Sequence, residues 1–184
     1  MTQPRQQSPA HRRVASCACG AVAIELRREP ILTVTCHCHS CQTAGARFAA
    51  EGAETLDRDG GTPYVVFRKD RVHCIKGAAR LEDYRLSPDA PTRRMVAACC
   101  RTPMFLEFLK GHWLSIYRDR LPPEDRPPVE MRTMTADRRE GVELPDDIPN
   151  LARHSGKFMW RLLAAWAAMG FRTPPMARVL GEEA

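Results

Sequence analysis

The sequence predicts a mainly β fold with one C-terminal helix. Three observations lead to this prediction. Short apolar or alternating segments follow one another between residues 21 and 117, turn residues separate them, and a helical pattern appears only near the end. The 184 residues suffice for one domain with a sizeable hydrophobic core.

The first two expected strands lead into a cysteine-rich loop. Residues 21–29 alternate apolar and polar side chains, as a half-buried strand does, and Pro30 interrupts the pattern. Residues 31–35 are apolar and β-branched and predict a second strand that runs directly into Cys36. Zinc knuckles are built in the order strand, cysteine loop, strand, so the body of the chain is expected to be all β.

Further strands are expected downstream of this loop, each bounded by glycine, proline or serine. The expected strands are residues 64–67, 71–75, 80–86, 94–98, 104–109 and 113–117. Beyond residue 118, prolines interrupt a charged stretch that can hold only a short strand around residues 129–133.

The last region predicts a helix over residues 158–169. Apolar residues stand at 158, 162, 166 and 169, Ser155 is a candidate cap, and Gly170 ends the pattern. The helix is too short for a membrane span. We expect it to pack on the sheet, with a dimer or membrane-surface contact as the alternatives.

These patterns divide the chain into four regions. The expected regions are a disordered tail (1–13), a zinc-binding β domain (14–117), a proline-rich connection (118–150) and a helical extension (151–184). The tail lacks the apolar segment of a secretory signal, so a cytoplasmic location is expected. In such a reducing compartment, clustered thiols are more often metal sites or catalytic groups than disulfides.

Seven of the eight cysteines lie close to another cysteine in the sequence. They are Cys17, Cys19, Cys36, Cys38, Cys41, Cys99 and Cys100. Such spacing lets one loop supply several thiolates to one ion, and zinc is the metal that this donor set favours. We therefore predict zinc ligation by these seven residues.

The charge pattern argues against a nucleic-acid partner. The net charge of +6 comes almost wholly from arginines, which are scattered among 22 acidic residues. Only three Trp and three Tyr are present, and they are dispersed. We expect neither a nucleic-acid nor a membrane partner, while an oligomer remains open.

The cysteine motifs resemble those of a known family. Cys17-Ala18-Cys19-Gly20 and Cys36-His37-Cys38-His39-Ser40-Cys41, followed by Gly45-Ala46, look like the glutathione-dependent formaldehyde-activating (Gfa) family, which includes centromere-protein-V-like proteins. The resemblance extends to Lys76-Gly77 and Thr102-Pro103. It implies an Mss4-like (β-tent) zinc-binding fold with two metal sites, one structural and one associated with substrate.

The resemblance also implies an activity. Cys36, Cys38 and Cys41 match the substrate-associated site, where three thiolates leave a fourth position for a substrate sulfur. The implied protein is a carbon-sulfur lyase that forms S-hydroxymethylglutathione from glutathione and formaldehyde. His37 is the candidate catalytic proton carrier, and His39 is a weaker one. The alternatives are a non-catalytic zinc-binding interaction module and a dithiol switch at Cys17 and Cys19.

The second metal site departs from the family pattern. The family closes with Cys-x-x-Cys-Gly, but here Ala97 stands at the first cysteine and Arg101 at the glycine, while Cys100 is retained. Cys99 is an awkward replacement, because adjacent side chains point apart on an extended strand.

Three outcomes are open for this site. They are an intact zinc site that recruits Cys99, a weak three-ligand site, and a lost metal whose thiols pack in the core. Cys74 or His73 are possible substitutes. His112 and His154 have no motif around them and are expected to be structural or surface residues.

Overall fold

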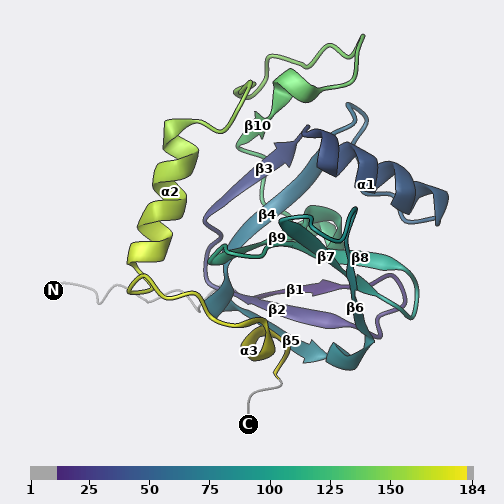
Figure 1. Ribbon diagram of the computed structural model, residues 1–184, viewed down its shortest axis with the longest axis vertical. Helices are drawn as coiled ribbons and strands as arrows, with labels where there is room; N and C mark the ends of the chain where they lie inside the picture. Colours follow the sequence, from purple (N-terminus) through teal and green to yellow (C-terminus); the bar gives the residue numbers. More distant parts are fainter. Residues whose placement is uncertain (1–11, 182–184) are drawn as a thin grey trace, which may run out of the picture.

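The computed structural model describes residues 12–181 as two β-sheets with three α-helices around them (Figure 1). The larger sheet has the strand order β10-β3-β4-β9-β8-β7-β6, and the smaller has β1-β2-β5. All pairs are antiparallel except β10 with β3. The strands are β1 (Arg12–Ser16), β2 (Ala23–Arg27), β3 (Leu32–Cys36), β4 (Thr62–Arg68), β5 (Val72–Lys76), β6 (Leu81–Tyr84), β7 (Thr92–Ala97), β8 (Thr102–Phe108), β9 (Trp113–Tyr117) and β10 (Met131–Thr133). The helices are α1 (His39–Ala50), α2 (Gly156–Ala167) and α3 (Met176–Leu180).

The mainly β prediction is confirmed, and strands occur at each expected segment, including the short one near residue 130. Residues 1–11 of the expected disordered tail lie outside the described residues. The tail prediction is wrong at Arg12 and Arg13, which already belong to β1 and pair with β2.

The segment after the cysteine loop is a helix, so the prediction of an all-β body is wrong there. Cys41, Ala44 and Phe48 recur at intervals of three and four residues, and all three are buried on one face of α1. The alanines of this segment favour helix. Because α1 starts directly after Cys38, the cysteine loop is a strand-to-helix connection.

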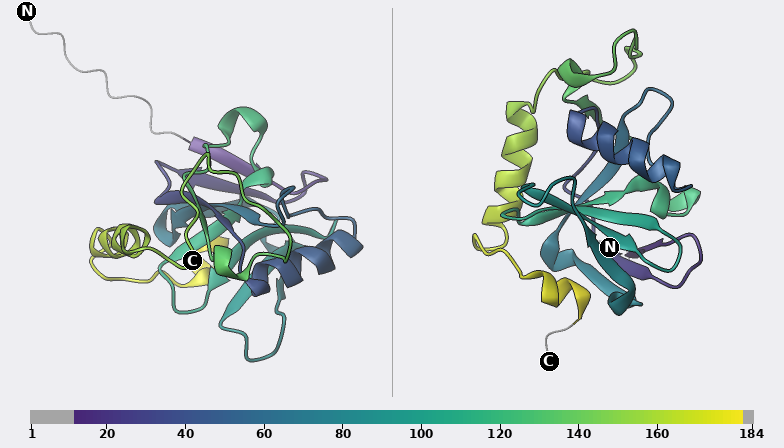
Figure 2. Two further views of the ribbon diagram at one scale, coloured as in Figure 1. Left: turned by 90° about the horizontal axis from the view of Figure 1, so that it is seen from above. Right: turned by 45° about the vertical axis from the view of Figure 1, so that its right-hand side comes forward.

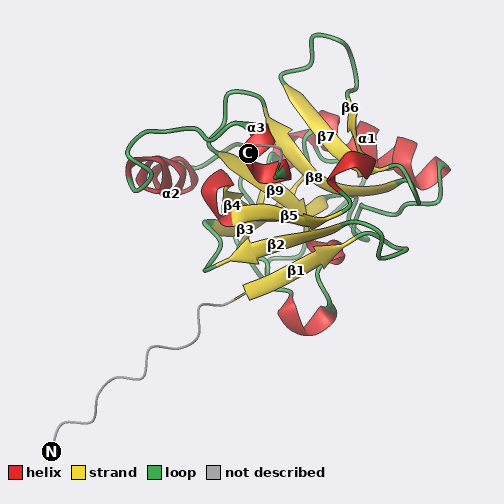
Figure 3. Cartoon of the chain, turned by 90° about the horizontal axis from the view of Figure 1, so that it is seen from below, coloured by secondary structure: helices red, strands yellow, loops and turns green. Residues whose placement is uncertain are grey.

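The larger sheet is buried on both faces, which places the core on either side of β4. Tyr64 and Val66 face one apolar cluster together with Phe48 of α1. Val65 and Phe67 face the other cluster, to which both sheets contribute residues. Figure 3 shows the smaller sheet, β1, β2 and β5, beside the larger one. Side chains alternate across a strand, so a strand covered on both faces reads as a continuous apolar run.

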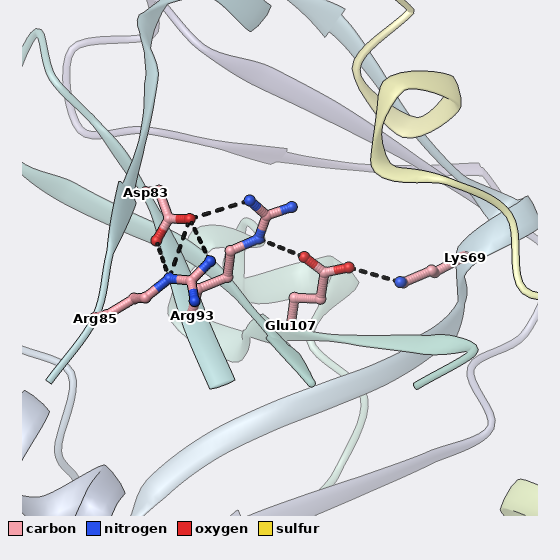
Figure 4. Close-up of polar contacts among 5 residues, drawn as sticks. All are labelled: Lys69, Asp83, Arg85, Arg93 and Glu107. Carbon is pink, nitrogen blue, oxygen red and sulfur yellow. Dashed lines mark hydrogen bonds and ion pairs between the residues drawn. The ribbon is translucent and has the colours of Figure 1, made fainter. Parts of the chain in front are cut away.

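A buried ionic network holds the end of β4 to the far edge of the larger sheet (Figure 4). The Lys69 amine lies 2.6 Å from the Glu107 carboxylate, and both side chains are under 5% exposed. The other carboxylate oxygen of Glu107 accepts from Arg93 at 2.6 Å, and Arg93 also contacts Asp83 on β6. Sharing one carboxylate between two cations compensates the buried charge of Lys69.

The expected C-terminal helix packs on the larger sheet as α2. Ser155 is its cap and accepts a hydrogen bond from the Phe158 amide at 3.1 Å. Phe158 and Leu162 are buried in the cluster that contains Tyr64. A third helix, α3, was not expected, and its Val179 is buried between the sheets. Within residues 12–181, no helix has both the length and the apolar content that crossing a bilayer requires.

Candidate metal centres

Two groups of cysteines come together in space, and together they contain all seven cysteines predicted as ligands. Within each group, the sulfur atoms lie within 4.8 Å of one another. We call them the four-cysteine cluster (Cys17, Cys19, Cys99 and Cys100) and the three-cysteine cluster (Cys36, Cys38 and Cys41). Neither group includes the proposed substitutes Cys74 and His73.

The four-cysteine cluster has the dimensions of a tetrahedral thiolate site. Sulfur-sulfur distances in this cluster are 3.6 Å for Cys17 with Cys19, 3.9 Å for Cys17 with Cys99, 3.3 Å for Cys19 with Cys99, and 3.8 Å for Cys99 with Cys100. Four ligands at about 2.3 Å from a tetrahedral zinc would lie about 3.8 Å apart. The donor set therefore fits a four-coordinate zinc ion.

A turn between β7 and β8 explains how two adjacent cysteines join one cluster. Residues 98–101 are in a turn, so the argument that adjacent side chains point apart on an extended strand does not apply to them. Arg101 has φ +54°, in the left-handed region that glycine adopts without strain. The glycine that the family has at this place matches that conformation. In this chain Arg101 adopts the left-handed conformation itself, and its guanidinium lies 2.9 Å from the Glu51 carboxylate.

The loop between β1 and β2, which carries Cys17 and Cys19, also has hydrogen bonds that position its sulfurs. Gly20 has φ +71° and closes a turn by donating to the Cys17 carbonyl at 3.0 Å. The Val22 amide donates to the Cys17 sulfur at 3.2 Å. Thr102 ties the two loops together, since its hydroxyl accepts from the Ala18 amide at 3.2 Å and lies 3.0 Å from the Cys100 sulfur.

The three-cysteine cluster lies where β3 passes into α1. Cys36 ends β3, Cys38 is the residue before α1, and Cys41 is in the first turn of the helix. Hydrogen bonds from the Cys36 and Cys41 thiols, with a smaller contribution from the Arg94 cation, lower the pKa of Cys38 to about 2. The same contact with Cys38 raises the pKa of Cys36. One thiolate is therefore stabilised by its neighbours and by the helix N-terminus.

Arg94 lies beside this cluster and is fully buried. One terminal nitrogen donates to the carbonyl and hydroxyl oxygens of Ser40, each at 3.0 Å. Its Nε and other terminal nitrogen have no hydrogen-bond partner among the described residues. A buried guanidinium is stable only when a negative charge compensates it. Three thiolates around a divalent cation would carry one negative charge, so Arg94 would complete a neutral centre.

The imidazole beside the three-cysteine cluster is His154, not His37. Thr133 is paired with Cys36 across β10 and β3, and its hydroxyl lies 3.0 Å from Nδ1 of His154. The His154 ring stacks on Phe158 with centroids 4.6 Å apart, and Cys38 is its electrostatic neighbour. From the sequence, His154 was expected to be a structural or surface residue. No sequence motif marks it, because it comes from the extension.

His37 points to the other face of β3, since side chains alternate along the chain through Thr35, Cys36 and His37. A Cβ on Gly61 would lie 2.3 Å from the Thr35 methyl group and 2.8 Å from the His37 ring. The ring is buried, its Nε2 has no partner among the described residues, and burial lowers the pKa of His37. His39 is exposed and lies 4.0 Å from Asp137. The catalytic assignment of His37 remains a prediction without support from this placement.

A cavity of about 510 Å³ opens on the face of β3 opposite to the three sulfurs. Thr35, Asp57 and Arg132 contribute to its lining, and Arg132 forms a 2.8 Å ion pair with Asp147 across it. No cysteine lines this cavity. It is therefore separate from both cysteine clusters.

Comparison with known proteins identifies the family of the central region. A family model described as glutathione-dependent formaldehyde-activating enzyme matches residues 12–116, more than half of the chain. No curated protein matches the sequence. A crystal structure of a Rhodobacter sphaeroides protein aligns with 63% of this chain and 96% of its own, at 18% identity and a TM-score of 0.44.

Proposed function

Because the chain belongs to the glutathione-dependent formaldehyde-activating family, we propose that it is a zinc-dependent carbon-sulfur lyase that acts on a thiol-aldehyde adduct such as S-hydroxymethylglutathione. The fold is mainly β and Mss4-like, as expected for this family. The observation that carries the proposal is the three-cysteine cluster with the buried cation of Arg94 against it.

The three-cysteine cluster is the proposed reaction site. Cys36, Cys38 and Cys41 would hold the ion, and no fourth histidine, cysteine, aspartate or glutamate of residues 12–181 joins their group. When bound, zinc would lower the pKa of a thiol at its open position and so supply a nucleophilic sulfur at neutral pH. The four-cysteine cluster, which has no such position, is proposed as the structural site.

The proposed reaction joins two molecules without an oxidant or reductant. A carbon-sulfur bond forms between the thiol sulfur and the aldehyde carbon, the carbonyl π bond breaks, and the thiol proton ends on the new hydroxyl oxygen. Arg94 would offset one negative charge of the thiolate-rich reaction site, and His154 is the proposed carrier of the proton. We also propose a cytoplasmic location, because a reducing compartment keeps clustered cysteines available as metal ligands.

Metal content and glutathione titration test the proposal together. Wild type is expected to hold two zinc ions per chain and to bind glutathione, measured by elemental analysis and calorimetry. Cys38→Ser should hold one ion, remain folded and show no heat of glutathione binding, because it removes a ligand of the proposed reaction site only. Cys74→Ser is the matched control, since Cys74 belongs to neither cluster.

Two results would contradict the lyase proposal. One is a wild-type protein with two zinc ions that binds no glutathione, which would favour the interaction module instead. The other is glutathione binding that survives in Cys38→Ser.

The role of His154 gives a separate prediction. His154→Gln is expected to lower the rate of S-hydroxymethylglutathione formation at least about tenfold, because it removes a positioned proton carrier. Zinc content should not change. Exchange NMR, with the spontaneous rate subtracted, measures product formation. His39→Gln is the matched control because its side chain is 83% exposed. An equal loss of rate in His154→Gln and His39→Gln would contradict the assignment of His154 as the proton carrier.

A further inference from the structure

Helix α2 presents an apolar face to solvent. Phe158 and Leu162 are buried, whereas Met159, Trp160 and Leu163 are 52%, 66% and 45% exposed. Leu163 lies three residues after Trp160 and four after Met159, so the three side chains form one continuous strip, with Trp160 opposite to the buried pair and Met159 at the margin of the strip. Figures 1 and 2 show α2 along one flank of the molecule, at its periphery.

A basic groove adjoins this face. A cavity of about 260 Å³ lies beside α2, and Arg68, Arg71, Trp160 and Arg161 contribute to its lining. Arg68 contacts Asp70 at 2.5 Å. Arg161 forms an ion pair with Glu130. Arg71 donates to the Glu29 carbonyl at 3.1 Å, and its charged neighbours are Arg68, Asp70 and Arg28.

The sequence around α2 carries charge of one sign. Residues 148–181 contain five arginines or lysines and no aspartate or glutamate. They include Lys157 and Arg161 on α2 itself and Arg172 just beyond it, next to the 59% exposed Phe171. A two-fold dimer through this face would bring two such basic segments together, which their repulsion opposes.

We propose that the outer face of α2 and the adjoining arginine groove form a docking surface for an anionic phospholipid bilayer. Met159, Trp160 and Leu163 enter the interface between headgroups and acyl chains, and the groove arginines bind lipid phosphates. The 12 residues of α2 make a helix of about 18 Å, too short to span a core of about 30 Å, so it lies parallel to the surface. The proposal departs from the sequence-based expectation of no membrane partner. It adopts the membrane-surface contact that was one of the alternatives for the C-terminal helix.

Vesicle sedimentation with the full chain tests this docking. Wild type is expected to sediment with vesicles of phosphatidylcholine containing 30% phosphatidylglycerol, but not with pure phosphatidylcholine. Trp160→Ser should weaken binding roughly tenfold or more, because it removes a large apolar contact. Arg71→Ala should weaken it about fivefold. Raising the salt concentration should release the protein.

Arg58→Ala is the matched charge control, since Arg58 lines the separate 510 Å³ cavity, and it should bind as wild type does. Circular dichroism checks that each variant is folded. Equal binding to neutral vesicles, no binding to anionic vesicles, or equal binding by wild type and Trp160→Ser would overturn the proposal. A stable wild-type dimer that Trp160→Ser dissociates would overturn it too, in favour of a second copy as the occupant.

Discussion

Cys17→Ser is expected to lower the zinc content from two ions to one per chain and to destabilise the fold by on the order of 5 kcal/mol. The reason is that the four-cysteine cluster joins the β1–β2 loop to the turn between β7 and β8, so a metal bound there would crosslink the two sheets. Structural zinc contributes directly to folding free energy. A loss of this size lowers the melting temperature of a chain of this length by about 10–20 °C. Calorimetric melting with parallel metal analysis measures both quantities.

Cys99→Ser decides among the three outcomes left open for this site. A site that recruits Cys99 loses its ion in this variant as it does in Cys17→Ser. Cys74→Ser is again the control, because the Cys74 thiol only donates to the Lys76 carbonyl and lies outside both clusters. An unchanged zinc content in Cys99→Ser would show a three-ligand site instead. One ion in the wild type, held by the three-cysteine cluster alone, would show that this metal is lost.

The sequence was sufficient for every strand except β1 and for the grouping of Cys36, Cys38 and Cys41. Alternation in residues 21–29 and apolar runs such as residues 64–67 carry the period of a strand, and short spacing places Cys36 and Cys38 on one loop. These are local signals, so no tertiary contact was needed to interpret them. The helix cap at Ser155 is a signal of the same kind and was also found.

The features that the sequence did not predict depend on tertiary contacts or on weak local signals. Small residues in α1 hide its helical period, and only burial of Phe48 reveals which face packs inward. Cys99 joins its cluster because Arg101 adopts a left-handed conformation that an arginine rarely takes. The sequence around Arg94 is that of an ordinary strand, and His154, which lies outside the family region, contacts the three-cysteine cluster through Thr133.

Arg94→Met is expected to weaken zinc binding at the three-cysteine cluster by about 10- to 100-fold and to leave the four-cysteine cluster occupied. The methionine fills a similar volume but leaves the negative charge of a three-thiolate metal centre buried without its cation. Competition with a chromophoric chelator measures the two affinities separately. Arg94→Lys retains the charge, although it loses part of the contact with Ser40, and should recover most of the affinity.

Stability measured with and without metal distinguishes this electrostatic role from simple core packing. In metal-free Arg94→Met, Cys38 can take up a proton, so the cluster becomes neutral and the substitution costs little. With zinc bound, the three sulfurs must remain thiolates and the charge stays, so the variant should lose about 2 kcal/mol more, in keeping with the weaker metal binding. Equal destabilisation in both states would mean that Arg94 only fills space in the core. A difference that disappears in Arg94→Lys would tie the buried cation directly to the thiolates.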